Sequence, residues 1–122
     1  MYERHQMGKN AESRAAEFFL THKNAKLLVR NYRWRGGEID LIFEEFLVEK
    51  LSYELVFVEV RARAPTGWVM GPESVTPQKQ RRLIKTSRHF LAQYTGRAKT
   101  LRMDLLHWDG TSWGHLQNLW LL

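Results

Sequence analysis

Two acidic residues lie within apolar segments, where burial of a carboxylate requires an explanation. Glu59 lies within the segment LVFVEV, and Asp40 lies within IDLIF. An ionised carboxylate is costly to bury unless it is paired, protonated or bound to a cation. Both residues are therefore candidates either for a functional site or for a buried ion pair.

The alternation of side chains along a strand predicts which residues accompany these acids. Glu59 and Arg61 fall on one face of their segment, and Asp40 shares a face with Glu38. If Asp40 lies opposite Glu59 on a neighbouring strand, the two carboxylates converge beside the Arg61 guanidinium. Oxygen ligands of this kind suit Mg²⁺ or Mn²⁺, which bind through one or two carboxylates, water and substrate phosphate.

Structural roles remain open for the same residues. Glu38 could join the site or interact with Arg35 across a turn, and Asp104 is typical of a strand residue that partners a nearby arginine. The structural alternative for Asp40 and Glu59 is a buried ion pair with Arg61, Arg63 or Arg102.

The positive charge of the chain is concentrated in one segment. The 122 residues carry a formal net charge of +6. Residues 60–102 hold ten basic residues and one acidic residue, a charge of +9, so the remainder carries −3. Such segregation favours a polyanionic partner, most plausibly nucleic acid, over a merely solvated basic face. Lys79, Arg82 and Lys85 recur every three residues and could follow a phosphate backbone.

Composition excludes several other classes of site and location. The chain has no Cys, and its five His show neither HxH nor HExxH spacing, which leaves no zinc motif. It also lacks a Gly-rich phosphate loop and a GxSxG motif. No apolar run approaches the roughly 18 residues that span a bilayer, and the first 20 residues lack an apolar signal core. We expect a cytoplasmic protein with no membrane partner.

The elements that position these residues follow from periodicity and turn signals. Arg35, Gly36 and Gly37 predict a tight turn, and Thr76 followed by Pro77 predicts a helix start that Gly96 ends downstream. The acidic segment 44–53 is ambiguous between a loop and a short helix. The predicted elements are a helix over 10–22, strands over 27–34, 38–43 and 54–63, a helix from 76 to 95, and strands over 101–108 and 113–121.

This order, α-β-β-β-α-β-β, predicts an α/β fold. The segment 54–63 is apolar on both faces through its first half, as expected of the central strand of a sheet that is covered on two sides. Helices packed against a mixed five-stranded sheet satisfy this pattern. Neither a repeat nor a linker divides the chain, so residues 1–122 are expected to form a single domain.

Several spaced blocks carry a family resemblance. They are GEIDLI at 37–42, FVEVRAR at 57–63, Ser74 and Val75 followed by Lys79, and RMDLL at 102–106, with Gly8 and Glu12 ahead of them. Together they resemble the signature of the YraN-like family over residues 8 to 120. That family is similar to the restriction-endonuclease-like superfamily and, within it, to the archaeal Holliday-junction resolvases. The resemblance implies a restriction-endonuclease-like core, a mixed sheet flanked by helices.

The resemblance also implies roles for individual residues. Asp40 and Glu59 correspond to the metal-binding acids, Glu12 to a helix-borne acid near the site, and Arg61 to the catalytic basic residue. The superfamily prefers Lys at this last position. Arg stays charged, so it can orient groups and offset negative charge but cannot handle a proton as Lys can. Lys79 is the candidate for the displaced ammonium.

These observations predict metal-dependent phosphodiester hydrolysis on nucleic acid, with branched or structured DNA as one candidate substrate. Mg²⁺ or Mn²⁺ would be held by Asp40 and Glu59, and Arg61, Glu12, Glu38 and Lys79 would complete the catalytic set. The predicted nucleic-acid contacts are Arg63, Lys79, Arg82, Lys85 and Trp68.

Two further hypotheses remain open beside the enzyme. Arg61 in place of Lys favours a nucleic-acid-binding module of the same fold without turnover. The acidic segment 44–54 or exposed aromatic side chains could instead serve a protein partner. A homodimer would suit a two-fold symmetric DNA junction.

Overall fold

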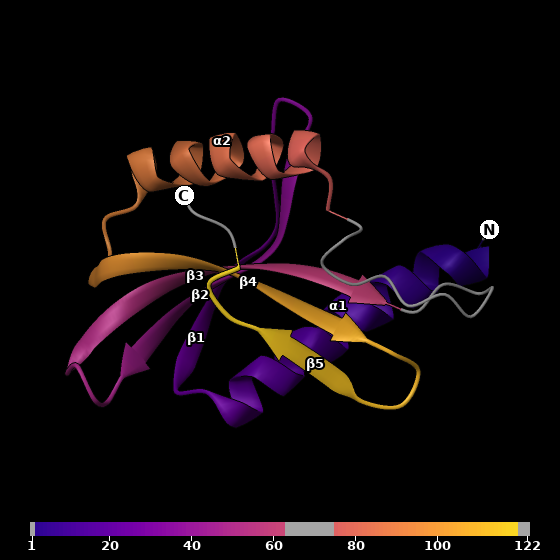
Figure 1. Cartoon of the computed structure of the whole chain (residues 1–122), viewed down its shortest axis with the longest axis horizontal. Coiled ribbons are helices and arrows are strands. Elements are labelled where there is room, and N and C mark those ends of the chain that lie inside the picture. Colours follow the sequence, from indigo (N-terminus) through magenta and orange to yellow (C-terminus); the bar gives the residue numbers. More distant parts are fainter. Residues whose placement is uncertain (1, 63–74, 120–122) are drawn as a thin grey trace.

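The computed structural model describes residues 2–62 and 75–119, and describes side chains from residue 11 onward. Arg63 and Trp68, two of the predicted nucleic-acid contacts, lie outside the described residues. The elements in chain order are α1 (Tyr2–His22), β1 (Ala25–Trp34), β2 (Gly37–Leu47), β3 (Ser52–Ala62), α2 (Pro77–Gln93), β4 (Ala98–Trp108) and β5 (Trp113–Leu116) (Figure 1).

The five strands form one mixed sheet in the order β1-β2-β3-β4-β5. Neighbouring strands are antiparallel except β3 and β4, which are parallel. A parallel pair needs a long crossover connection, and α2 lies within the one between these two strands. The predicted α/β class, the element order and the central place of the third strand are all confirmed.

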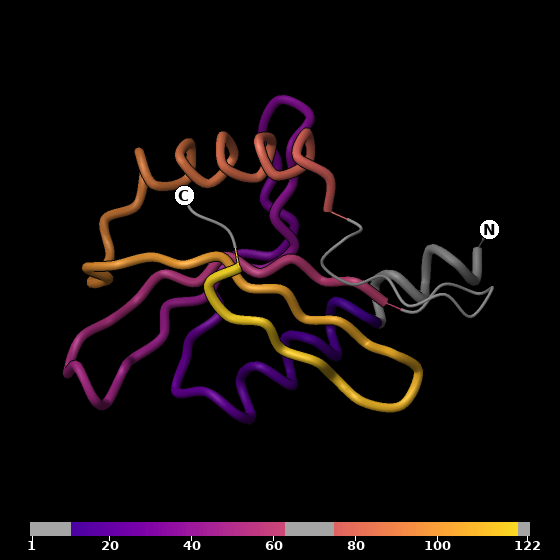
Figure 2. The backbone as a smooth tube through the Cα atoms, in the orientation of Figure 1, coloured from indigo at the N-terminus to yellow at the C-terminus, as the bar shows by residue number. Residues whose placement is uncertain are grey.

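The two helices cover opposite faces of the sheet (Figure 2). On β3, Val56, Val58 and Val60 pack in the apolar cluster that includes Phe19 of α1. Phe57 packs in the other cluster, with residues of α2. The predicted alternation along this strand is therefore confirmed, and it places Glu59 and Arg61 on the face of Phe57.

Some element boundaries differ from the predictions. Helix α1 begins at Tyr2 rather than at residue 10. The prediction was too short because the residues before Ala11 show no apolar periodicity. Strand β5 ends at Leu116 rather than at 121. Asn118 has a φ of 53°, which breaks the extended chain, and the N–H of Leu119 donates to the carbonyl of Met103 at 2.8 Å.

The ambiguous acidic segment turns out to be strand, turn and strand. Glu44 and Glu45 are buried in β2, and Glu54 lies in β3. All three are engaged in ion pairs inside the fold, with Arg97 or Arg102. These acidic residues therefore do not form a continuous acidic surface, although residues 48–51 in the turn between the strands are exposed.

The β1–β2 hairpin bends out of the sheet toward α2 (Figure 1). The pairing of β2 with β3 ends at Leu41 opposite Val58. At the tip, Gly37 packs so closely on α2 that a Cβ there would lie 2.0 Å from the Thr86 hydroxyl oxygen. Because the hairpin leaves β3 at Asp40, the sheet opens at the position of the two predicted acids.

Helix α2 begins as predicted from the Thr76–Pro77 signal. The Thr76 side chain accepts a hydrogen bond from the N–H of Lys79 at 3.2 Å, and Pro77 is the first helical residue. Tyr94 ends the helix in an extended conformation, two residues before Gly96. Neither helix of the described chain is long and apolar enough to cross a lipid bilayer.

Candidate metal centre

Asp40 lies where β2 separates from β3. The N–H of Val60 donates to Asp40 Oδ2 at 2.8 Å, so a side chain replaces the backbone acceptor that regular pairing would supply. The carboxyl groups of Asp40 and Glu59 share a hydrogen bond. The convergence expected from strand alternation is therefore observed.

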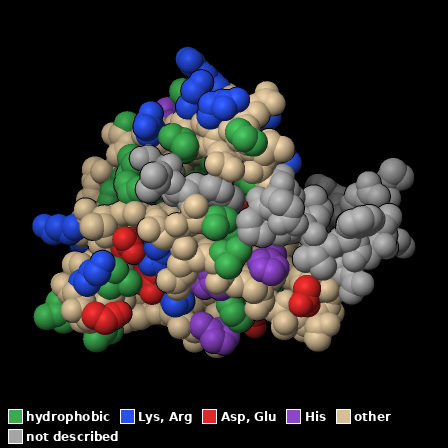
Figure 3. Space-filling model, viewed as in Figure 1, with side chains coloured by type: hydrophobic (Ala, Val, Ile, Leu, Met, Phe, Trp, Pro, Cys, Tyr) green, Lys and Arg blue, Asp and Glu red, His purple; other side chains and the backbone are tan. Residues whose placement is uncertain are grey.

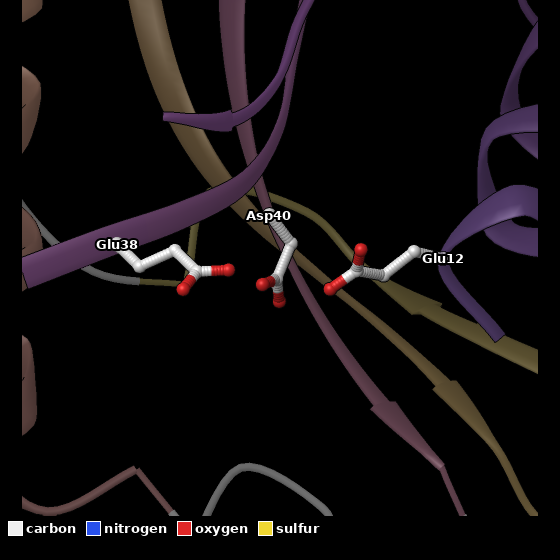
Figure 4. Close-up of side chains that lie close together, drawn as sticks. All are labelled: Glu12, Glu38 and Asp40. Atoms are coloured by element: carbon white, nitrogen blue, oxygen red, sulfur yellow. The ribbon is translucent and has the colours of Figure 1, made fainter. Parts of the chain in front are cut away.

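Two further acids complete what we call the acid cluster, defined as Glu12, Glu38, Asp40 and Glu59. Carboxylate oxygens of Glu12, Glu38 and Asp40 lie within 4.8 Å of one another. Figure 4 shows Glu12 reaching in from α1 while Glu38 and Asp40 extend from β2. The cluster thus joins three segments that are distant in sequence.

Glu12 and Glu38 each have a second partner. Glu12 hydrogen-bonds the side chain of Asn31 as well as that of Asp40. Glu38 accepts a hydrogen bond from Arg33 Nε at 3.1 Å, so its ion pair is with Arg33 rather than with Arg35, which was the expectation for a purely structural role.

Glu38, Asp40 and Glu59 line a pocket of about 280 Å³ between the hairpin and α2. Cationic side chains face them there: Lys79 and Arg82 from α2 and Arg61 from β3. Lys79 is close enough to Glu59 for its charge to lower the pKa of that carboxyl. Lys85 is exposed on α2 outside this lining. The pocket is lined by Gly36, Gly37, Glu38, Asp40, Glu59, Arg61, Lys79, Arg82 and Leu83.

Burial raises the pKa values of three carboxyl groups of the cluster, those of Asp40, Glu59 and Glu12. Burial raises the pKa of Asp40 to about 9, and the charge of Glu59 adds to the rise. Burial also raises the pKa of Glu59, although Arg61 opposes this, and it raises the pKa of Glu12. At neutral pH Asp40 would therefore keep its proton unless a metal cation replaced it.

Arg61 forms an ion pair with Glu59, as expected if these residues had a structural rather than a metal-binding role. Its Nη2 lies 2.7 Å from Glu59 Oε2. Its Nε is buried and has no hydrogen-bond partner among the described residues. Arg102 lies elsewhere, on Glu45, Glu54 and Asp104, so the prediction that Asp104 partners an arginine is confirmed.

The donor set fits a small, hard divalent cation. All four acids offer oxygen ligands, which Mg²⁺ and Mn²⁺ prefer. Two oxygens bound to one Mg²⁺ at about 2.1 Å lie at most about 4.2 Å apart. Oxygens already within 4.8 Å of one another would need only a small side-chain movement to reach that spacing. The set closest to this geometry contains Glu12 and Glu38 with Asp40, whereas the sequence pointed first to Asp40 and Glu59.

Two parts of the site were missed at the sequence level. Asn31, which binds Glu12, has a φ of 53°, a conformation that Asn adopts more readily than most residues. The only advance signal was an Asn inside a predicted strand. The aromatic residues that support the hairpin tip, Trp34 and His89, meet through a long-range contact that periodicity does not reveal.

Comparison with known proteins places the chain in a family. The model of the Uncharacterised protein family UPF0102, the YraN family, matches residues 11–107, which confirms the resemblance noted above. A UPF0102 protein from Ralstonia nicotianae is 42% identical over 107 residues, covering 85% of this chain and 78% of that protein. One from Nitrosomonas europaea is 45% identical over 89 residues, with 73% and 70% covered. One from Persephonella marina is 33% identical over 111 residues, with 91% and 90% covered. The matched range contains the whole acid cluster.

Proposed function

We propose that this chain, which belongs to the uncharacterised protein family UPF0102, is a metal-dependent nuclease that hydrolyses phosphodiester bonds in DNA. The observation that carries the proposal is the pocket that three acids of the cluster line together with three cations. The acids are Glu38, Asp40 and Glu59, and the cations are Arg61, Lys79 and Arg82. Acids of this kind hold a divalent cation, and cations at the rim of the same pocket bind phosphate. The acids and the cations together favour phosphodiester chemistry more strongly than either set would alone.

Asp40 and Glu59 would hold Mg²⁺ or Mn²⁺, with Glu12 and Glu38 beside them. When bound, the metal ion would polarise the phosphate and lower the pKa of the attacking water. The raised pKa of Asp40 supports this role, because a metal cation would replace the proton that Asp40 otherwise keeps.

The remaining groups would bind and stabilise the phosphate. Arg61 offsets negative charge on its oxygens while the water oxygen bonds to phosphorus and the bond to the leaving oxygen breaks. Its buried, unpartnered Nε is a donor that such an oxygen could satisfy. Lys79 lies in the pocket and can donate a proton to the leaving oxygen.

Nucleic acid would lie along α2. Lys79, Arg82 and Lys85 are exposed there, and they belong to no ion pair among the described residues. Arg63 and Trp68 remain predicted contacts. Branched DNA as the substrate and a homodimer with one site for each of two symmetric strands are also part of the proposal.

A cleavage assay on plasmid DNA and on a synthetic four-way junction tests the proposal. The full chain should cleave one of these substrates with Mg²⁺ or Mn²⁺ and should not cleave in EDTA. Asp40→Asn and Glu59→Gln should each lower the rate at least about 100-fold, because they remove metal ligands. Glu44→Gln is the matched control: it removes a buried carboxylate from the same strand, β2, but lies outside the pocket. Cleavage that survives Asp40→Asn and Glu59→Gln would rule out this site as its origin.

A second candidate function is a DNA-binding module that has lost turnover. The observation that favours it is the 2.7 Å ion pair between Arg61 and Glu59, which occupies an oxygen that a metal ion would need. In that case the protein would bind DNA in a salt-dependent manner, and no cleavage would follow in either metal. Arg61→Lys then provides a sharper comparison, because Lys can release Glu59 and take part in proton transfer.

A further inference from the structure

A three-layer stack supports the tip of the β1–β2 hairpin beside the acid cluster. The Arg35 guanidinium carbon lies 5.0 Å from the centroid of the Trp34 ring. The His89 ring stacks on the same indole, with centroids 4.6 Å apart and ring planes 15° apart. His89 Nδ1 in turn lies 2.6 Å from the Tyr32 hydroxyl. Residues of the hairpin and of α2 thus jointly hold Arg35.

The backbone at the tip is unusual for an arginine. Arg35 and Gly36 have φ values of 43° and 80°, the left-handed pair that tight hairpins use. Such positions normally carry Asn, Asp or Gly, because a larger L side chain is strained there. Strained residues of this kind persist where the surrounding structure holds them, and they often mark functional sites.

Arg35 extends a cationic surface that begins on α2. Lys79, Arg81, Arg82, Lys85 and Arg88 are all exposed on that helix, which contains no acidic residue. The first of them lie near the helix N-terminus, where positive charge opposes the helix dipole. Arg35 is exposed as well and has no ion pair among the described residues. Figure 3 shows Lys and Arg side chains gathered over α2 and the hairpin tip.

The contacts of Trp34 also favour duplex over single-stranded DNA as the ligand. Single-stranded DNA is commonly bound by bases stacking on free aromatic faces. The His89 ring and the Arg35 guanidinium both lie over the Trp34 ring, so a base would have to displace one of them to stack there. A guanidinium held in this way is suited to a phosphate oxygen of a paired backbone.

We propose that the hairpin tip is a second DNA contact, in which Arg35 binds a backbone phosphate of duplex DNA and Trp34 and His89 position it. Gly36 and Gly37 of the same tip line the pocket with Asp40 and Glu59, so this contact would fix the duplex next to the acid cluster. The inference rests on the proposed function, since it names the form of substrate that the site receives.

Binding of a fluorescent DNA duplex in EDTA at several salt concentrations tests the contact without cleavage. Arg35→Ala should weaken binding about tenfold and reduce the slope of log affinity against log salt by about 1, as the loss of one phosphate contact requires. Arg97→Ala is the matched control: Arg97 is 65% exposed and lies 4.0 Å over the Tyr53 ring, beyond the C-terminal end of α2. It should bind with the wild-type slope.

Trp34→Leu separates positioning from folding. If Trp34 acts through Arg35, this variant weakens binding, and adding Trp34→Leu to Arg35→Ala weakens it no further. Trp34→Phe keeps a ring under Arg35 and should bind within about threefold of wild type. Thermal melting of each variant shows whether it is folded before its affinity is compared.

The outcomes distinguish this inference from the function on which it rests. Duplex binding by the wild type with an unchanged affinity and slope for Arg35→Ala would overturn the contact and leave the nuclease proposal intact. Tighter binding of single-stranded than of duplex DNA would overturn the choice of duplex. If the wild type bound no duplex even at low salt, the proposed function and the inference would both fail.

Discussion

Asp104 and Asp40 are both carboxylates inside the same sheet, yet their surroundings shift their pKa values in opposite directions. Asp104 is fully buried on β4. It receives hydrogen bonds from Arg102 Nε at 3.0 and 3.1 Å and from the N–H of Asn118 at 3.0 Å, and His115 Nε2 lies 2.8 Å away. Burial alone would raise its pKa, but these partners outweigh burial and lower it.

Asp40 forms no ion pair with a cation among the described residues. The N–H of Val60 donates to it, and the carboxyl groups of Glu12, Glu38 and Glu59 lie close to it. Burial and the charge of Glu59 therefore raise its pKa to about 9. A buried acid with its cation in place is part of the fold, whereas a buried acid among other acids favours a cation from outside.

The largest expected change in stability is at Arg102, which pairs with Glu45, Glu54 and Asp104 in the interior. Arg102→Met should lower the free energy of unfolding by about 3–5 kcal/mol, because Glu45, Glu54 and Asp104 would all lose their guanidinium partner in the interior. Urea denaturation measures the change, and Lys99→Met, which removes an exposed charge from the same strand, provides a control expected to stay within about 0.5 kcal/mol of wild type. A loss below about 1 kcal/mol for Arg102→Met would contradict the structural role of this cluster.

The same substitution should have opposite signs at the two aspartates. Asp104→Asn should destabilise by about 1–3 kcal/mol at pH 8, because it weakens bonds to Arg102 and His115. Asp40→Asn should instead stabilise by at least about 1 kcal/mol in EDTA, since it replaces an acid whose ionisation the fold opposes. Urea denaturation of the two variants at pH 8 makes the comparison.

The pH dependence of stability follows from the raised pKa of Asp40. Between its unfolded value near pH 4 and its folded value of about 9, the folded chain keeps a proton that the unfolded chain has lost. The contribution of Asp40 to stability is therefore fully present below pH 4 and falls as pH rises to about 9. The advantage of Asp40→Asn over wild type should grow from pH 5 to pH 8. An advantage that stayed constant or shrank would show that Asp40 is not held protonated.

Metal binding should reverse the disadvantage of the ionised cluster. Mn²⁺ at about 100 times its dissociation constant should stabilise the wild type by about 2.7 kcal/mol at pH 8. The stabilisation at the same Mn²⁺ concentration should be smaller at pH 6, because protons on the carboxylates compete with the metal. Thermal melting at both pH values, with Glu44→Gln as the control, checks this. Equal stabilisation at both pH values would mean that the metal binds elsewhere.

The smallest expected effects concern the exposed cations of α2 that line the pocket beside the acid cluster. Lys79→Ala and Arg82→Ala should each reduce the salt slope of duplex binding by about 1, and their stability should change little because both side chains are exposed. Lys99→Ala removes an exposed charge from β4 and should leave the slope unchanged. Equal effects of all three variants would indicate diffuse attraction rather than a binding surface beside the acids.

Much of this contrast could be predicted from the sequence because it depends on strand alternation. The acid inside LVFVEV and the apolar residues around it established which face Glu59 occupies, and the turn at Gly36 established that β1 and β2 form a hairpin. The role of Glu12 came only from the family resemblance, because a single acid on a helix carries no periodic signal.

The rest depends on contacts between residues that are distant in sequence. Arg102 forms ion pairs with Glu45 of β2 and Glu54 of β3. These pairs place acidic residues of a segment whose structure the sequence left ambiguous inside the fold. The ion pair of Glu38 with Arg33 and the stack of Trp34 on His89 depend on how far the hairpin bends, and turn chemistry alone does not specify that bend.

The most direct test of the acid cluster is a Mn²⁺ titration of the metal-free full chain at pH 8, followed by electron paramagnetic resonance of the free ion. The proposed metal centre predicts that the wild type and Glu44→Gln bind at least one Mn²⁺ per chain and that Asp40→Asn loses this binding. The proposed role of Glu59 as a ligand predicts the same loss for Glu59→Gln. A wild type that leaves all Mn²⁺ free, or an Asp40→Asn variant that binds as the wild type does, would contradict a metal centre at these residues.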